Sequence, residues 1–225
     1  MNPHLLLISL HADPASPSGA ENAGGTHAYI RELLTGLASR GWEATMVTRR
    51  ASADLPARER ISRHTTINRI QIGPLGPLHK SHLDGLHAES VASTREVVLR
   101  GRRRPDLVHS VYWNSGRVAL DLSGELGIPF VHTVISNGKR RTLMGAARNA
   151  SRREEVEGWV FGAAFRIFCI SQEERRDLVD LYSVDPARLV VVGRPVAECF
   201  LDPAHDEMGR PRPLRLARDA AGEAP

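Results

Sequence analysis

The stretch GGTHAYIRELLTGLASRG, residues 24–41, decides the fold. Its apolar side chains recur at positions 30, 33, 34, 37 and 38, a spacing that places them on one face of a helix. Gly41 follows the last of them and predicts the end of this helix. An apolar run at residues 5–10 precedes the stretch. We therefore expect a buried strand followed by an amphipathic helix, which begins a parallel α/β unit.

Apolar runs and helical periodicities alternate along most of the chain. They predict further strands at residues 44–48, 67–72, 106–110, 130–134, 166–170 and 189–192, and helices at 83–99, 116–126, 149–163 and 172–182. Ser171 and Glu174 form the pattern of a capping box before the last helix. The alternation predicts an α/β fold, a Rossmann-like doubly wound parallel sheet over residues 1–200. Residues 201–225 are rich in proline, alanine and charge, so we expect a disordered tail or a truncated linker there.

The composition favours a globular domain and argues against a secreted, a membrane-spanning or a nucleic-acid-binding protein. The 225 residues are 41% apolar and 25% charged, with a formal net charge of +4, as in a globular domain with its own core. Cys169 and Cys199 form no disulfide framework and no C-x-x-C motif, which favours the cytoplasm. The run at 5–10 is too short for a signal peptide, and no run has the length of a membrane span. The basic clusters are typical of solvated loops, so nucleic acid is not an expected partner.

The two adjacent glycines at the start of the first helix predict an anion site. A helix N-terminus offers unpaired N–H groups and a positive dipole at the carboxyl edge of such a sheet. Gly24 and Gly25 let a phosphate approach the backbone without a Cβ in the way, and Thr26 adds a hydroxyl. A tight turn without a ligand is the alternative. The dinucleotide fingerprint G-x-G-x-x-G is absent from the sequence, which argues against a single-domain NAD enzyme.

Five segments, in the same order, resemble the retaining family 4 glycosyltransferases. They are GGTHAYIRELLTGLASRGWEATMVTRR (24–50), PDLVHSVYWNSGRVA (105–119), GIPFVHTVISNGKRR (127–141), EGWVFGAAFRIFCISQEERRDLVDLY (157–182) and RLVVVGRPVAECF (188–200). The chain is most similar to the branch that includes sucrose-phosphate synthase and the mycothiol glycosyltransferases. The resemblance implies the N-terminal half of a GT-B fold, in which two Rossmann-like domains enclose the active site.

The resemblance also implies the substrates and the residues near them. A nucleotide-sugar is the expected co-substrate, with no other cofactor and no metal, and Gly24, Gly25 and Thr26 are expected at its diphosphate. A small-molecule acceptor is expected near seven residues, which are His109, Tyr112, Trp113, Thr133, Ser136, Lys139 and Arg141. For the histidine and the aromatic pair, a place in the core is the alternative, and for the two cations a solvated loop.

Departures from the family pattern leave the catalytic activity open. The 225 residues contain no E-x7-E donor motif, so we expect a second polypeptide to supply the donor-binding domain. Ile135 stands where the family has its cleft histidine, and Val111 stands in place of another histidine. An alkyl side chain cannot relay a proton, so the catalytic group is unassigned. The alternative function is a non-catalytic partner or scaffold, a degenerate glycosyltransferase that docks another transferase.

Overall fold

The computed structural model describes residues 2–16, 24–146 and 151–194. The described residues up to Arg194 belong to one compact unit. The tail expected at 201–225, the last residues of the expected 1–200 domain, and the first two residues of the helix expected at 149–163 lie outside the described residues.

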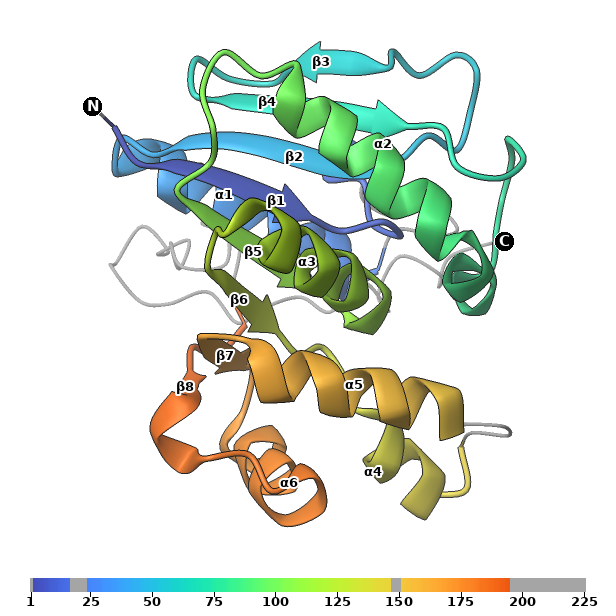
Figure 1. Cartoon of the computed structure of the whole chain (residues 1–225), viewed down its shortest axis with the longest axis vertical. Coiled ribbons are helices and arrows are strands. Elements are labelled where there is room, and N and C mark those ends of the chain that lie inside the picture. The colour runs from blue at the N-terminus through green and yellow to red at the C-terminus, as the bar shows by residue number, and fades with distance from the viewer. Residues whose placement is uncertain (1, 17–23, 147–150, 195–225) are drawn as a thin grey trace, which may run out of the picture. The chain divides into compact units, whose positions relative to one another are not determined.

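The elements follow one another in an α/β order (Figure 1). They are β1 (His4–Ile8), α1 (Gly25–Ser39), β2 (Glu43–Arg49), β3 (Arg58–Arg60), β4 (Thr65–Ile70), the 3-10 helix η1 (Lys80–Leu86), α2 (His87–Leu99), β5 (Leu107–Val111), α3 (Trp113–Leu126), β6 (Phe130–Thr133), α4 (Gly138–Leu143), α5 (Ser151–Ala163), β7 (Arg166–Cys169), α6 (Gln172–Tyr182), the 3-10 helix η2 (Pro186–Arg188) and β8 (Leu189–Val191). No helix in the described part of the chain has the length and hydropathy of a membrane-spanning segment.

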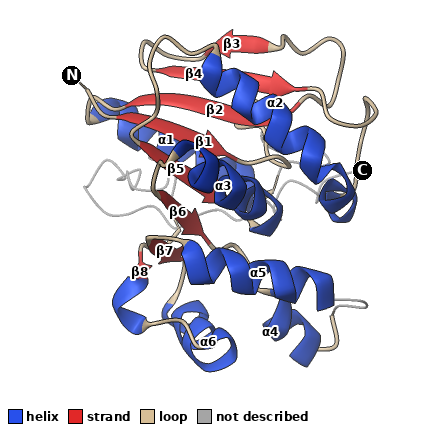
Figure 2. Cartoon of the chain, in the orientation of Figure 1, coloured by secondary structure: helices blue, strands red, loops and turns tan. Residues whose placement is uncertain are grey.

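The strands form one sheet in the order β3-β4-β2-β1-β5-β6-β7-β8 (Figure 2). Neighbouring strands are parallel, except that β3 pairs antiparallel with β4 at the edge. β1 pairs with β2 on one side and with β5 on the other. The strand order therefore reverses at β1 and β5, which is the topological switch point of a doubly wound sheet. The predicted α/β fold is confirmed.

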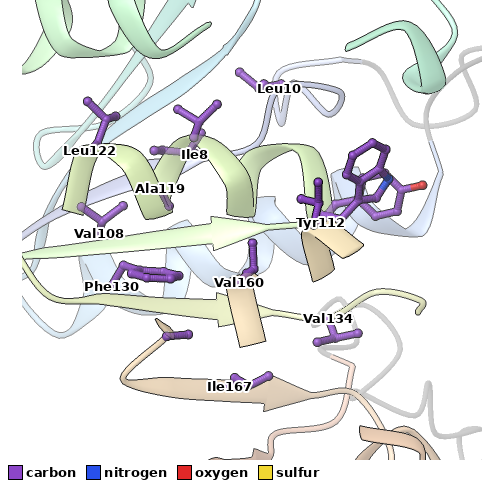
Figure 3. Close-up of a cluster of buried hydrophobic side chains, with 14 of the residues drawn as sticks. Ile8, Leu10, Val108, Tyr112, Ala119, Leu122, Phe130, Val134, Val160 and Ile167 are labelled. Atoms are coloured by element: carbon purple, nitrogen blue, oxygen red, sulfur yellow. The ribbon is translucent and has the colours of Figure 1, made fainter. Parts of the chain in front are cut away.

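Helices cover both faces of the sheet, as the doubly wound prediction requires. Ile30 and Leu34 of α1 pack with Leu5 and Leu7 of β1 on one face. The helices α2, α3 and α5 pack on the other face, where Figure 3 shows Leu122 above side chains of the central strands. Successive side chains of β1 therefore enter two different apolar layers, which explains why the sequence of this strand is an unbroken apolar run.

The element ends follow local signals that the sequence carries. Gly41 has a φ of +78° directly after the C-cap of α1, as its place after the apolar stripe predicts. The Glu174 amide donates to Ser171 Oγ at 3.1 Å, which confirms the predicted N-cap of α6. β3 and α4 were not predicted, because the strand has three residues and only polar side chains, and the helix has six residues without an apolar stripe.

Gly116 allows α3 to pack closely against β6 and α5. A Cβ at this position would lie 2.9 Å from His132 Cε1 and 2.9 Å from Val160 Cγ1, and both neighbours are buried. We expect Gly116→Ala to lower the free energy of unfolding by about 1–3 kcal/mol through overpacking. Gly124→Ala is the control in the same helix, because no atom lies within 4 Å of its Cβ position. It should raise stability by about 0.5–1 kcal/mol, and urea denaturation showing equal effects of the two variants would refute this packing argument.

Candidate functional site

A cavity of about 540 Å³ opens at the carboxyl edge of the sheet, beside β1 and β2. The loop after β1, the first turn of α1, the end of β2 and the segment leading into η1 form its wall. The lining residues are Leu10, His11, Asp13, Ser16, Gly24, Thr26, His27, Thr48, Arg49, Ala51, Pro77, Leu78, His79, Lys80 and Leu83. Ligands bind at this place in open α/β sheets, and the volume is within the range of small-molecule sites.

The predicted diphosphate residues form the start of α1. Gly24 is the N-cap, and its amide donates to His27 Nδ1 at 3.2 Å. Gly25 is the first helical residue, so its amide and that of Thr26 have no carbonyl acceptor within the helix. Gly24 and Thr26 line the cavity, and a Cβ on Gly25 would meet only Arg194 Nη1, at 3.1 Å. The helix end thus presents two backbone donors beside a cationic side chain.

Two histidines in the cavity wall are held in the neutral state. Burial lowers the pKa of His11 to about 3, and the charges of Lys80 and His27 act in the same direction. Burial also lowers the pKa of His27, although Asp13 opposes this. Because the Gly24 amide donates to Nδ1, neutral His27 carries its proton on Nε2. Its ring therefore offers a neutral N–H donor.

Tyr112 lies next to the cavity with cations around its ring. The Lys80 Nζ atom is 5.3 Å and the Arg153 Cζ atom 5.1 Å from the ring centroid, and the His11 ring is 4.7 Å away. Arg153 also donates to the Tyr112 hydroxyl at 3.4 Å and to the Ser136 carbonyl at 2.6 Å. Tyr112 has a φ of +73°, a backbone conformation that costs a non-glycine residue about 1–3 kcal/mol. Two cationic side chains thus lie near the Tyr112 ring, and one of them, Lys80, also lines the cavity.

His109 and Thr133 belong to a buried chain of hydrogen bonds. The Tyr29 hydroxyl lies 3.0 Å from Thr133 Oγ1, which lies 2.7 Å from His109 Nε2. The His109 ring packs edge-on against Phe168, and burial lowers its pKa to about 4. These two predicted acceptor residues connect α1 with β5 and β6 and do not belong to the cavity lining described above.

The remaining predicted acceptor residues divide into two groups. Trp113 is buried in the apolar cluster under α3, and Ser136 is half-buried with its hydroxyl 3.1 Å from Arg153 Nη2. Lys139 donates from Nζ to the Leu181 carbonyl at 2.6 Å, and Arg141 is exposed on α4. Ser136 is therefore joined to Tyr112 through Arg153. Lys139 lies in the contact between α4 and α6, whereas Arg141 lies on the surface of α4.

Glu157 fixes the position of Arg153. Its Oε1 accepts from Arg153 Nε at 2.7 Å, and its Oε2 accepts from the Gly138 amide at 2.7 Å and from the Tyr182 hydroxyl. The side chain is 1% exposed, and burial raises the pKa of its carboxyl while Arg153 lowers it. Because Glu157 holds one edge of the guanidinium, the other edge faces Ser136 and Tyr112.

Apolar side chains occupy the two positions where the family pattern has histidines. Val111 is fully buried among the residues packed under α1, and Ile135 is partly buried between the two apolar layers. Both fill space in the core, and neither can donate or accept a proton. The domain therefore has no ionisable group at these two positions.

Sequence reasoning did not identify Lys80, Arg153, His11 or Asp13 as site residues. Lys80 follows a loop with no periodicity, and Arg153 lies in the charged first turns of α5. Only the fold brings them together at Tyr112. The available signal was the sheet topology itself, because every loop that follows a strand near the switch point reaches this edge.

The sequence and the fold of the chain match known proteins. Residues 24–195 match the glycosyl transferase 4-like domain. The chain belongs to this family. It is an N-terminal family 4 glycosyltransferase domain of the GT-B type.

Similar proteins include two curated relatives and one solved structure. D-inositol 3-phosphate glycosyltransferase from Acidothermus cellulolyticus is 33% identical over 92% of this chain and 47% of its own length. The enzyme of the same name from Kineococcus radiotolerans is 35% identical over 83% of this chain and 44% of its own. Sucrose-phosphate synthase from Thermosynechococcus elongatus superposes with a TM-score of 0.76 at 28% identity, over 85% of this chain and 48% of that one. The chain thus spans about half the length of these proteins.

Proposed function

We propose that this domain is the acceptor-side half of a nucleotide-sugar-dependent glycosyltransferase, and that its acceptor is a phosphorylated polyol. The convergence of Lys80 and Arg153 on Tyr112 beside the cavity carries this proposal. Two cations and a phenol hydroxyl suit a phosphate group, and the 540 Å³ cavity suits a small polyol. The two curated relatives act on D-inositol 3-phosphate by name, which makes this compound the first acceptor to test.

The donor is proposed to meet the start of α1. The amides of Gly25 and Thr26 point out of the helix N-terminus, where the helix dipole stabilises an anion. Gly24 lines the cavity, but its amide is not free to bind the diphosphate, because it already donates a hydrogen bond to His27 Nδ1. The leaving diphosphate of a nucleotide-sugar would gain electrostatic stabilisation there, and no further cofactor is part of the proposal.

Donor binding is proposed to need a second Rossmann-like domain outside these 225 residues. The curated relatives are about twice as long as the part that this chain matches, and the sequence holds no E-x7-E motif. A second polypeptide is our expected source of that domain. Adding it in trans tests this source directly.

A non-catalytic scaffold is the second candidate function. Ile135 favours it, because the position of the family's cleft histidine holds a side chain that packs in the core. A scaffold would retain the docking surface for another transferase while its own cleft carries out no chemistry.

Reconstitution separates the two functions. The full chain is mixed with the remaining half of the Acidothermus cellulolyticus relative, and hexose transfer from UDP-, GDP- and ADP-sugars to inositol 3-phosphate is measured. The acceptor-half proposal predicts transfer that requires both polypeptides. Binding of the two polypeptides without any transfer, although the chain binds inositol 3-phosphate, would support the scaffold and contradict the acceptor-half proposal.

Lys80→Ala tests the anion site in the chain alone. Removing the ammonium group takes away one charge-assisted contact, so the dissociation constant for inositol 3-phosphate should rise about tenfold, which is roughly 1.4 kcal/mol. Isothermal titration calorimetry at low salt measures this change. Arg104→Ala, which removes an exposed cation from the loop before β5, is the control and should leave affinity within twofold. Equal losses in both variants would indicate general charge attraction instead of a site.

A further inference from the structure

Asp13 brings a carboxylate into the cavity wall, and a buried arginine fixes its position. Its Oδ2 accepts from Arg69 Nε at 2.5 Å, and its Oδ1 accepts from Arg69 Nη2 at 3.4 Å and from the Ala15 amide at 2.9 Å. The Arg69 side chain is 0% exposed and also pairs with Glu59 at 2.7 Å and with the Pro56 carbonyl. Arg69 therefore acts as a positioning residue for the Asp13 carboxylate.

The carboxylate keeps acceptor capacity for a ligand. Two carboxylate oxygens offer about four lone-pair sites, and the three bonds described above occupy three of them. The side chain is 11% exposed and lines the cavity. A hydroxyl group in the cavity thus has an acceptor that is already oriented, so little conformational entropy is lost when the bond forms.

Two imidazoles share the cavity wall with Lys80 and this carboxylate. His11 lies close enough to Lys80 and to His27 for both to influence its ionisation, and His27 lies close enough to Asp13 for the same effect. Both imidazoles are neutral, so neither cancels the charge of Lys80 or of Asp13. The cavity wall consequently contains two neutral imidazoles together with the cation of Lys80 and the carboxylate of Asp13, and Arg49 and His79 also line it.

We propose that Asp13 binds hydroxyl groups of the acceptor and orients it with its phosphate toward Lys80. A carboxylate accepts hydrogen bonds from hydroxyls and repels a phosphate, so the opposite orientation brings like charges together. The inference rests on the proposed function, because it takes the ligand to be a polyol phosphate. It adds a residue that discriminates a polyol phosphate from a bare phosphate.

The test compares ligands with and without hydroxyls on the full chain. Asp13→Asn removes the charge and keeps the shape, and we expect the dissociation constant for inositol 3-phosphate to rise about tenfold, as for loss of a bond to a charged group. The constant for inorganic phosphate should stay within twofold or fall, because a repulsive charge is gone. Glu59→Gln is the matched control, since it removes the charge of the other carboxylate that pairs with Arg69 and does not alter the cavity lining, and it should leave both constants within twofold.

The outcomes separate this inference from the function on which it rests. Equal weakening of inositol 3-phosphate and inorganic phosphate in Asp13→Asn would mean that Asp13 only supports the loop, and unchanged binding of both would also overturn the inference. Wild-type protein that binds neither ligand would overturn the proposed acceptor instead.

If Asp13→Asn does not fold, Asp13→Glu is the second variant, because it keeps the ion pair but moves the carboxylate. It should weaken the binding of inositol 3-phosphate several-fold while leaving the binding of inorganic phosphate unchanged. Undiminished affinity in that variant would contradict the inference.

Discussion

Gly25→Val should reduce sugar transfer by the reconstituted enzyme at least about 100-fold, the cost of removing one preorganised donor from a developing charge. The isopropyl group would cover the helix end where the Gly25 and Thr26 amides emerge. The fold should tolerate it, because Gly25 has no positive φ and its Cβ position meets only the flexible end of Arg194, at 3.1 Å. Steady-state rates at saturating acceptor measure the loss.

A glycine within the same helix provides the control for this variant. Gly36 is also helical, and its Cβ position has only an ordinary contact, 3.6 Å from Arg40 Nη1, so Gly36→Val should transfer sugar at the wild-type rate. The affinity of Gly25→Val for inositol 3-phosphate should stay within threefold of wild type. Transfer retained by Gly25→Val would show that the diphosphate does not approach this helix end. Lost acceptor binding would assign the glycines to the acceptor instead.

Much of the fold follows from local patterns in the sequence. The run at β1 is apolar on both faces, and the stripe of α1 ends at Gly41, so both elements could be located before the structure was known. Short or polar elements could not be predicted from the sequence. β3 is an example, because its pairing with β4 depends on register and not on burial. The start of α3 at Trp113 was also missed by three residues, since the positive φ of Tyr112 has no signal in residue type.

The candidate site is less predictable than the fold. The glycine pair at the start of α1 was predicted from the sequence, and Gly24 lines the cavity, whereas its place at a diphosphate stays a prediction. Lys80 and Arg153 are 73 positions apart in the numbering of the sequence and meet at Tyr112 only through tertiary structure. In the sequence, Asp13 is not distinguishable from any other loop aspartate, because its ion pair with Arg69 forms only in the folded structure. Charged residues in loops follow no periodic pattern, so the sequence alone does not predict which of them meet in the folded structure.

Glu174 should make the stability of the domain fall as the pH rises. Its side chain is 7% exposed, and burial raises the pKa of its carboxyl from 4.5 to about 7, helped by Asp177 and Glu157 and opposed by the Ile170 amide and Arg194. The folded state therefore favours the protonated carboxyl. Its stabilising contribution is complete below the unfolded pKa, declines between pH 4.5 and 7, and is lost above the folded pKa.

The size of this effect follows from the two pKa values. A change in the carboxyl pKa from 4.5 to about 7 corresponds to roughly 3 kcal/mol of unfolding free energy. Glu174→Gln mimics the protonated group and leaves an oxygen to accept from the Ile170 amide, which now donates to Glu174 Oε2 at 2.8 Å. We expect the variant to be more stable than wild type by roughly 3 kcal/mol at pH 8 and by less than about 1 kcal/mol at pH 5.

Comparing variants at each pH isolates Glu174 from the buried histidines. His11, His109 and His132 have pKa values lowered by burial, so they destabilise wild type and variant equally in acid. Glu173→Gln is the control, because that neighbouring side chain is 70% exposed and should change stability by less than about 0.5 kcal/mol at either pH. Urea denaturation at pH 5 and pH 8 measures all three proteins. A gain for Glu174→Gln that is the same at both pH values would show that this carboxyl titrates normally in the folded protein.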